Sequence, residues 1–160
     1  MLVCVDCEGA SFDTFDQACT FAITQNAKLY IATVVDPKPY ATIQRFDRKI
    51  VKRTEEEAHE TLIKYQRRAI DKGLTNTETI FETGSPSIKI TQHIVPNYNI
   101  DLVMIGANQG NKVERILVGS VSDAIIKSAS CDVITVRSAD IDHKAKNNLF
   151  IRSNKNTHEG

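Results

Sequence analysis

The sequence predicts an α/β protein with an open parallel sheet that helices cover on both faces. Short apolar runs of strand length alternate along the chain with longer segments of helix length, the order of elements in such folds. The run "DLVMI" is almost entirely apolar, as in strands buried on both faces. The chain has 160 residues, 41% of them apolar and 25% charged, which is enough for one globular domain with a sizeable core.

The first strand and the first helix are expected at the start of the chain. The strand is "LVCVD", residues 2–6, and reads as buried. The helix should begin after Ser11, whose hydroxyl can cap its amino end, and continue to about Asn26. Its apolar face is formed by residues at three- and four-residue spacing, namely Phe15, Ala18, Cys19 and Ala22.

The second strand and a long helix follow. The strand is "KLYIATVV", residues 28–35, and the prolines of "DPKPY" end it. The helix is polar overall and runs from about Thr42 to Lys72, with Gly73 suited to the position after its carboxyl end. Its inner stripe includes Ala58, Leu62, Tyr65 and Ala69.

The third strand is predicted at "TETIFE", residues 77–82. The motif "GSP" then predicts a turn in which Ser85 caps a helix and Pro86 takes its first position. This helix should end near Asn97.

The fourth and fifth strands are predicted at "DLVMI", residues 101–105, and at "DVITV", residues 132–136. A last helix, "GSVSDAIIKSAS", lies between them. From residue 139 to residue 160 the chain is a polar tail, so the domain is expected to span residues 1–138. A short apolar segment at residues 149–151 interrupts the polar tail. This segment can dock on a partner subunit, or it can have no binding partner.

The charge balance and the hydropathy exclude two classes of partner. Twenty basic residues balance twenty acidic ones, so the broad positive field of a general nucleic-acid binder is absent. No apolar run is long enough to cross a bilayer, and the start "MLVCVDCEGAS" does not resemble a signal peptide. We therefore expect a cytoplasmic protein that binds neither nucleic acid nor membrane.

The spacing of Cys4 and Cys7 allows a redox or metal-binding pair. A zinc site needs two further ligands, and the sequence holds neither a second such pair nor histidines at ligand spacing. A small thiol in the apolar run "LVCVD" also packs well in a core. Core packing is the favoured interpretation, and no metal site is predicted.

A glycine-rich stretch, "GANQGNKVERILVGS", spans residues 106–120 and contains three of the seven glycines of the chain. It follows a buried strand and leads into a helix that starts near Gly119. Such a helix start offers free N–H groups and a partial positive charge to a phosphate, with Ser120 and Ser122 adding hydroxyls. The stretch matches neither the Walker A loop nor G-x-G-x-x-G. Phosphate binding and simple turn formation both remain open on these residues alone.

The chain from residue 2 to about residue 138 resembles the universal stress protein family. The family signature, G-x-x-G followed by nine residues and G-[ST], lies between the fourth strand and the fourth helix; Gly106 matches its first glycine, and Gly119 with Ser120 matches its end. "VCVD", "TVVD" and "GSP" also resemble the family. The resemblance implies five parallel strands in the order 3-2-1-4-5, an adenine nucleotide alpha hydrolase-like fold.

The resemblance further implies a stress-response regulator that binds ATP or AMP, with or without Mg²⁺, and has no efficient catalysis. Asp6 would bind the nucleoside, Val34 would line the adenine pocket and Gly106 would pass close to the ribose. The phosphates would be held by the start of the last helix, through Gly119, Ser120, Val121 and Ser122. A homodimer through the fifth strands is also implied.

One residue departs from the family signature. Gln109 stands where the second glycine is expected, and Gly110 follows one position later. A glutamine strongly disfavours the positive φ that a glycine allows. Either the loop shifts its register and uses Gly110, or the phosphate cradle is impaired. In the second case the protein is a dimeric interaction protein of the same fold. No catalytic residue is predicted, because no carboxylate or histidine in the stretch stands out as a base for water.

Overall fold

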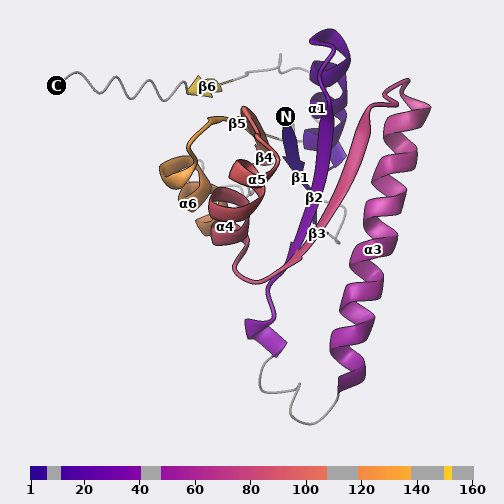
Figure 1. Ribbon diagram of the computed structural model, residues 1–160, viewed down its shortest axis with the longest axis vertical. Helices are drawn as coiled ribbons and strands as arrows, with labels where there is room; N and C mark the ends of the chain where they lie inside the picture. The colour runs from indigo at the N-terminus through magenta and orange to yellow at the C-terminus, as the bar shows by residue number, and fades with distance from the viewer. Residues whose placement is uncertain (7–11, 41–47, 108–118, 138–149, 153–160) are drawn as a thin grey trace, which may run out of the picture.

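The computed structural model describes residues 1–6, 12–40, 48–107, 119–137 and 150–152. Five parallel strands form one sheet in the order β3-β2-β1-β4-β5, and a short sixth strand pairs antiparallel with β5 (Figure 1). The strands are β1 (Leu2–Cys4), β2 (Leu29–Val35), β3 (Thr77–Thr83), β4 (Leu102–Gly106), β5 (Asp132–Val136) and β6 (Phe150–Arg152). The predicted parallel sheet and its strand order are confirmed.

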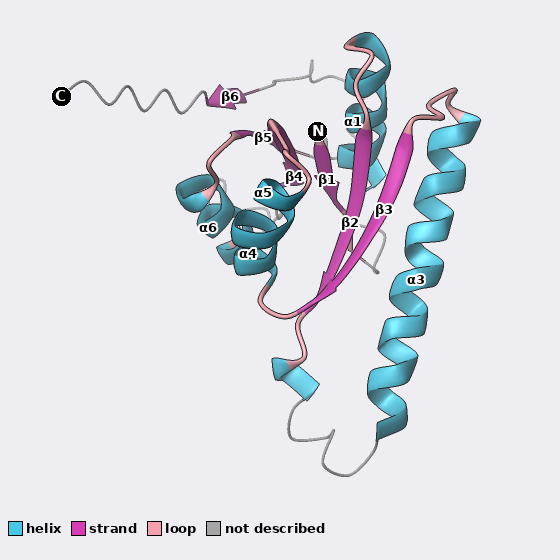
Figure 2. Cartoon of the chain, in the orientation of Figure 1, coloured by secondary structure: helices cyan, strands magenta, loops and turns pink. Residues whose placement is uncertain are grey.

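Helices cover both faces of the sheet, as Figure 2 shows. Two helices pack on one face, and the remaining ones pack on the other. The first group is α1 (Phe12–Thr24) and α3 (Arg48–Asp71); the second is α4 (Pro86–Ile88), η2 (Lys89–Ile94), α5 (Val95–Asn97) and α6 (Ser120–Ser128); a short turn, η1 (Lys38–Tyr40), follows β2. Within the part of the chain that the structure describes, no helix is both long and apolar enough to cross a membrane.

The core on the first face is built from the two predicted helix stripes. Phe15 and Tyr65 lie at its centre, with ring centroids 4.7 Å apart and exposed fractions of 0% and 2%. All other residues predicted for these stripes are buried as well: Ala18, Cys19, Ala22, Ala58, Leu62 and Ala69. The 3.6-residue periodicity therefore identified the inner faces of α1 and α3 correctly.

The helix between β3 and β4 differs from the single regular helix that the sequence predicted. It begins at Pro86 and ends at Asn97, as expected, but its middle segment η2 is π-helical. The cause lies in Pro96, which has no N–H to donate to the carbonyl four residues before it and whose ring crowds that carbonyl. A wider turn just before the proline relieves this conflict.

The outer edge of β5 is paired with β6 rather than left open. Residues 133–135 of β5 lie opposite residues 150–152 in an antiparallel register, with Ile134 opposite Ile151. The apolar segment predicted at residues 149–151 thus overlaps β6, which is a strand of this chain's own sheet. Residues 139–149 and 153–160 of the predicted tail lie outside the described residues. The homodimer through β5 stays a prediction.

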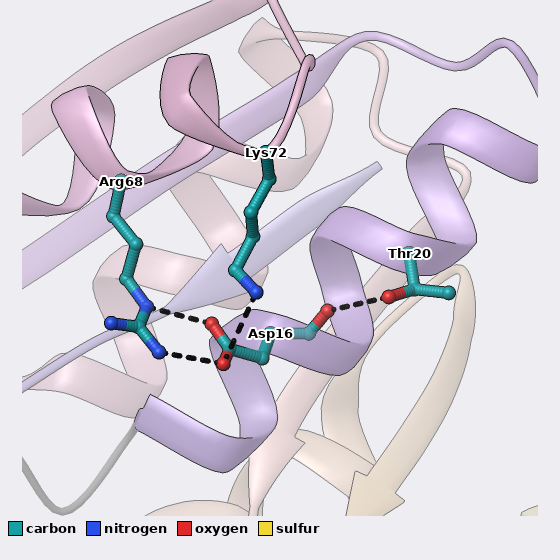
Figure 3. Close-up of polar contacts among 4 residues, drawn as sticks. All are labelled: Asp16, Thr20, Arg68 and Lys72. Atoms are coloured by element: carbon teal, nitrogen blue, oxygen red, sulfur yellow. Dashed lines mark hydrogen bonds and ion pairs between the residues drawn. The ribbon is translucent and has the colours of Figure 1, made fainter.

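A charged cluster ties α1 to α3 on the first face of the sheet (Figure 3). Arg68 donates two hydrogen bonds to the carboxylate of Asp16, Nε to Oδ1 at 2.7 Å and Nη2 to Oδ2 at 2.6 Å. Lys72 Nζ lies 3.3 Å from the same Oδ2. The hydrogen bond from Arg68 is the main reason why the pKa of Asp16 is lowered, against the opposing effect of its partial burial.

Replacing Asp16 by asparagine should therefore make the stability of the protein less dependent on acid pH. Because the folded-state pKa of Asp16 lies below the unfolded value of about 3.9, its stabilisation is complete above that pH and is lost as the pH falls through the folded-state pKa. Both partners are partly exposed, so we expect the variant to lose only about 1 kcal/mol of unfolding free energy at pH 7. Urea titrations from pH 7 to pH 2.5 test this. A difference between the two proteins that stays constant with pH would contradict it.

Candidate functional site

The candidate site lies where the chain reverses its direction of travel across the sheet. From β1 the chain moves to β2 and β3 through helices on one face, and from β4 it moves to β5 through α6 on the other face. The neighbours β1 and β4 therefore form the topological switch point. Open parallel sheets bind their ligands at the carboxyl ends of the strands at such a point.

Three predicted site residues meet at this edge of the sheet. Cys4 of β1 lies opposite Ala32 of β2, and the same register carried two residues further places Asp6 level with Val34. Gly106 ends β4, which borders β1 on the other side. The strand β1 ends at Cys4, two residues earlier than predicted, so Asp6 lies just past it and is exposed.

Val34 is half-buried and packs against the hydrophobic cluster that lies on the α6 face of the sheet. Part of its side chain therefore belongs to the core. Val34 lies near the carboxyl end of β2, and the register of β1 and β2 places it at the same level as Asp6. A contact with an adenine ring stays a prediction.

Gly106 is explained by a close approach from α1. A Cβ atom at this position would lie 3.1 Å from the hydroxyl oxygen of Thr14. This is tighter than ordinary van der Waals contact, so the glycine lets the first turn of α1 approach the end of β4. The space beside Gly106 on this side is occupied by Thr14, and the contact with a ribose that the family resemblance implies stays a prediction.

The amino end of α6 has no side-chain cap. Gly119 holds the N-cap position with φ −56° and ψ 156°, and its carbonyl accepts the first helical hydrogen bond, from the N–H of Asp123 at 2.8 Å. The N–H groups of Ser120, Val121 and Ser122 precede that bond and have no helical acceptor. Ser120 and Val121 are exposed. These N–H groups and the helix dipole together suit an anion.

Ser122 has a structural task in addition to the predicted one. Its hydroxyl donates to the carbonyl oxygen of Gly106 at 3.1 Å, which fixes the first turn of α6 to the end of β4. A serine hydroxyl carries a single proton, so this one is not available to a phosphate while the bond holds. The backbone N–H of Ser122 is unaffected.

An acidic residue in the first turn of α6 opposes the binding of an anion, but a basic side chain offsets its charge. Asp123 forms an ion pair with Lys127, Oδ2 to Nζ at 2.6 Å. Sequence reasoning did not single out this pair, although the i,i+4 spacing in "DAIIK" is the usual signal for one.

The remaining candidates are the cysteine pair and two residues of the glycine-rich stretch. Burial raises the pKa of the Cys4 thiol to about 12, which disfavours a reactive thiolate at this position in the metal-free protein. Cys7, Gln109 and Gly110 lie outside the described residues. Among the residues that are described, no three of His, Cys, Asp or Glu come together as metal ligands.

Comparisons with known proteins agree with this geometry. A sequence model of the universal stress protein family matches residues 1–137. A relative from Staphylococcus haemolyticus that is named for the same family is 36% identical over 141 residues, which cover 88% of this chain and 86% of the relative.

Two solved structures extend the likeness to the fold. UspA from Lactobacillus plantarum superposes with a TM-score of 0.72 at 25% identity, over 85% of this chain and 95% of that one. A universal stress protein in complex with cAMP superposes with a TM-score of 0.62, also at 25% identity, over 85% of this chain and 94% of that one.

Proposed function

The chain belongs to the universal stress protein family, and from that premise we propose that it binds an adenine nucleotide, ATP or AMP, at the carboxyl edge of β1 and β4. The observation that carries the proposal is the uncapped start of α6, where three N–H groups without helical acceptors stand beside the end of β4. The complex of a structurally similar protein with cAMP supports an adenine nucleotide as the ligand class.

The proposed pose follows from the positions of the site residues. The phosphates lie against the backbone of Ser120, Val121 and Ser122, where the helix dipole favours negative charge. The nucleoside extends toward Asp6, which lies just past β1, and toward Val34, which lies at the same level near the end of β2. The one carboxylate in the first turn of α6, that of Asp123, is held by Lys127. We therefore propose that the bound nucleotide acts as a signal in a stress response rather than as a substrate for rapid hydrolysis.

The second candidate function rests on Gln109. If its side chain closes the phosphate cradle, the protein binds no nucleotide and works through its surfaces as an interaction protein of the same fold. The feature that separates the two functions is therefore a single residue of the signature.

Calorimetric titration with ATP decides between the two functions. We expect the wild-type protein to bind ATP with micromolar affinity, with and without Mg²⁺, and Gln109→Gly to bind it at least as tightly because a glycine relaxes the backbone there. Binding by the variant alone would show that Gln109 closes the cradle. Absence of binding by both proteins would refute nucleotide binding.

A further inference from the structure

Thr14 carries a buried hydroxyl without a partner. The residue is 1% exposed, and its hydroxyl oxygen makes no hydrogen bond to any residue that the structure describes. Leaving a buried hydroxyl unpaired costs about 1–3 kcal/mol, and most buried polar groups in folded proteins are paired. An orphan of this kind needs an explanation.

Other helical threonines of this chain show the usual solution, which is a hydrogen bond to the carbonyl four residues earlier. Their hydroxyls donate over 2.8–3.0 Å in all four cases: Thr20, Thr24, Thr61 and Thr91. Thr14 lies in the first turn of α1, so the carbonyl four residues earlier precedes the helix. Because Thr14 lies at the amino end of α1, its hydroxyl has no carbonyl of the same helix to which it could donate this bond.

The hydroxyl of Thr14 stands at the end of β4. The 3.1 Å distance to an added Cβ shows that it occupies the place a side chain of residue 106 would take. Gly106 has no side chain that could bind a ligand, and the hydroxyl at this position comes from Thr14 of α1 instead. Side-chain groups at the carboxyl ends of neighbouring strands are the ones that meet ligands in open parallel sheets.

The hydroxyl lies on the side of the sheet opposite to the expected phosphate site. Thr14 approaches Gly106 from α1, whereas Ser122 bonds the Gly106 carbonyl from α6, and these two helices pack on opposite faces. A threonine hydroxyl is neutral and can both donate and accept. It can therefore pair with a sugar hydroxyl, which has the same two capacities, and its place away from the start of α6 favours the sugar over the phosphates.

We propose that Thr14 is a ligand-binding residue whose hydroxyl hydrogen-bonds the sugar of the nucleotide at the end of β4. The inference rests on the proposed nucleotide function and adds to it a residue that selects a nucleoside phosphate over a bare phosphate chain. Thr14 is 1% exposed in the ligand-free structure, so this contact requires its hydroxyl to become accessible when the nucleotide binds.

The test replaces Thr14 by valine, which keeps the shape but removes the hydroxyl, with Thr14→Ser as the matched control. Calorimetry measures binding of two probes, ATP and inorganic tripolyphosphate. We expect Thr14→Val to bind ATP about 5- to 20-fold more weakly than the wild type and tripolyphosphate equally well. Thr14→Ser should stay within about 3-fold of the wild type for both, because its hydroxyl remains. The urea midpoint of ligand-free Thr14→Val should not fall, since no native hydrogen bond is lost.

The other outcomes contradict the proposal in distinguishable ways. If the wild type binds ATP and Thr14→Val binds it equally well, Thr14 has no role at the ligand. An equal loss for ATP and tripolyphosphate, or a lower urea midpoint, would assign Thr14 to the general structure instead. A wild type that binds neither probe would overturn the nucleotide function itself and the role of Thr14 with it.

Discussion

Replacing Phe15 by alanine should lower the free energy of unfolding by about 3–5 kcal/mol, because it opens a cavity at the centre of the core on the α1 side of the sheet. The side chain is 0% exposed and belongs to the cluster that joins α1 and α3 to the strands. Its ring lies 4.7 Å from that of Tyr65, so the variant also loses an aromatic contact between the two helices.

Phe12→Ala is the matched control for that prediction. Phe12 also lies on α1 and also contacts Tyr65, with ring centroids 5.2 Å apart, but 46% of it is exposed. Its replacement should cost about 1 kcal/mol or less, since little apolar surface leaves the core. Urea unfolding followed by circular dichroism measures both variants. Equal losses would mean that burial does not set the scale here.

Placing tryptophan at Ser120 should abolish ATP binding, with a loss of affinity of at least about 100-fold. Ser120 is the first residue of α6, directly after the N-cap Gly119, and the phosphates are proposed to lie against its N–H and those of the next two residues. An indole ring at that position fills the space that the phosphates need. Since Ser120 is exposed, the folded state should accommodate the ring.

The opposite end of the same helix provides the control. Ser128 is the last residue of α6 and is likewise exposed. Ser128→Trp should bind ATP like the wild type in the same calorimetric titration, and both variants should keep the wild-type unfolding temperature within a few degrees. A folded Ser120→Trp variant with unchanged affinity would show that the phosphates lie elsewhere.

Local pattern predicted most of the fold because the elements are regular. The stripes of α1 and α3 obey the helical period, so residues such as Phe15 and Tyr65 could be assigned to the core before the helices were placed in space. The boundaries were less accurate. The strand β4 continues to Gly106, one residue further than predicted, and the π-helical turn before Pro96 reflects a conflict within a helix that an apolar pattern does not reveal.

The candidate site could be predicted only in part, since it depends on contacts between distant segments. Parallel strands gather their carboxyl ends at one edge, so the proximity of Asp6 and Val34 followed from the topology. The approach of Thr14 to Gly106 joins residues of α1 and β4, and no local signal in the sequence marks it. The bond from Ser122 to the Gly106 carbonyl is of the same kind.

The pairing of β6 with β5 makes the two ends of the sheet unequal toward a second chain. At residues 133–135 the outward backbone groups of β5 are directed to residues 150–152 of the same chain. At the other end, β3 pairs only with β2 among the described strands. An added strand could lengthen the sheet directly at β3, but at β5 it would first have to exchange with β6. β6, which pairs with this edge of β5, lies beyond residue 137, the last residue that the family model matches. A homodimer through β5, which the sequence predicted, would therefore require residues 150–152 to leave this edge first.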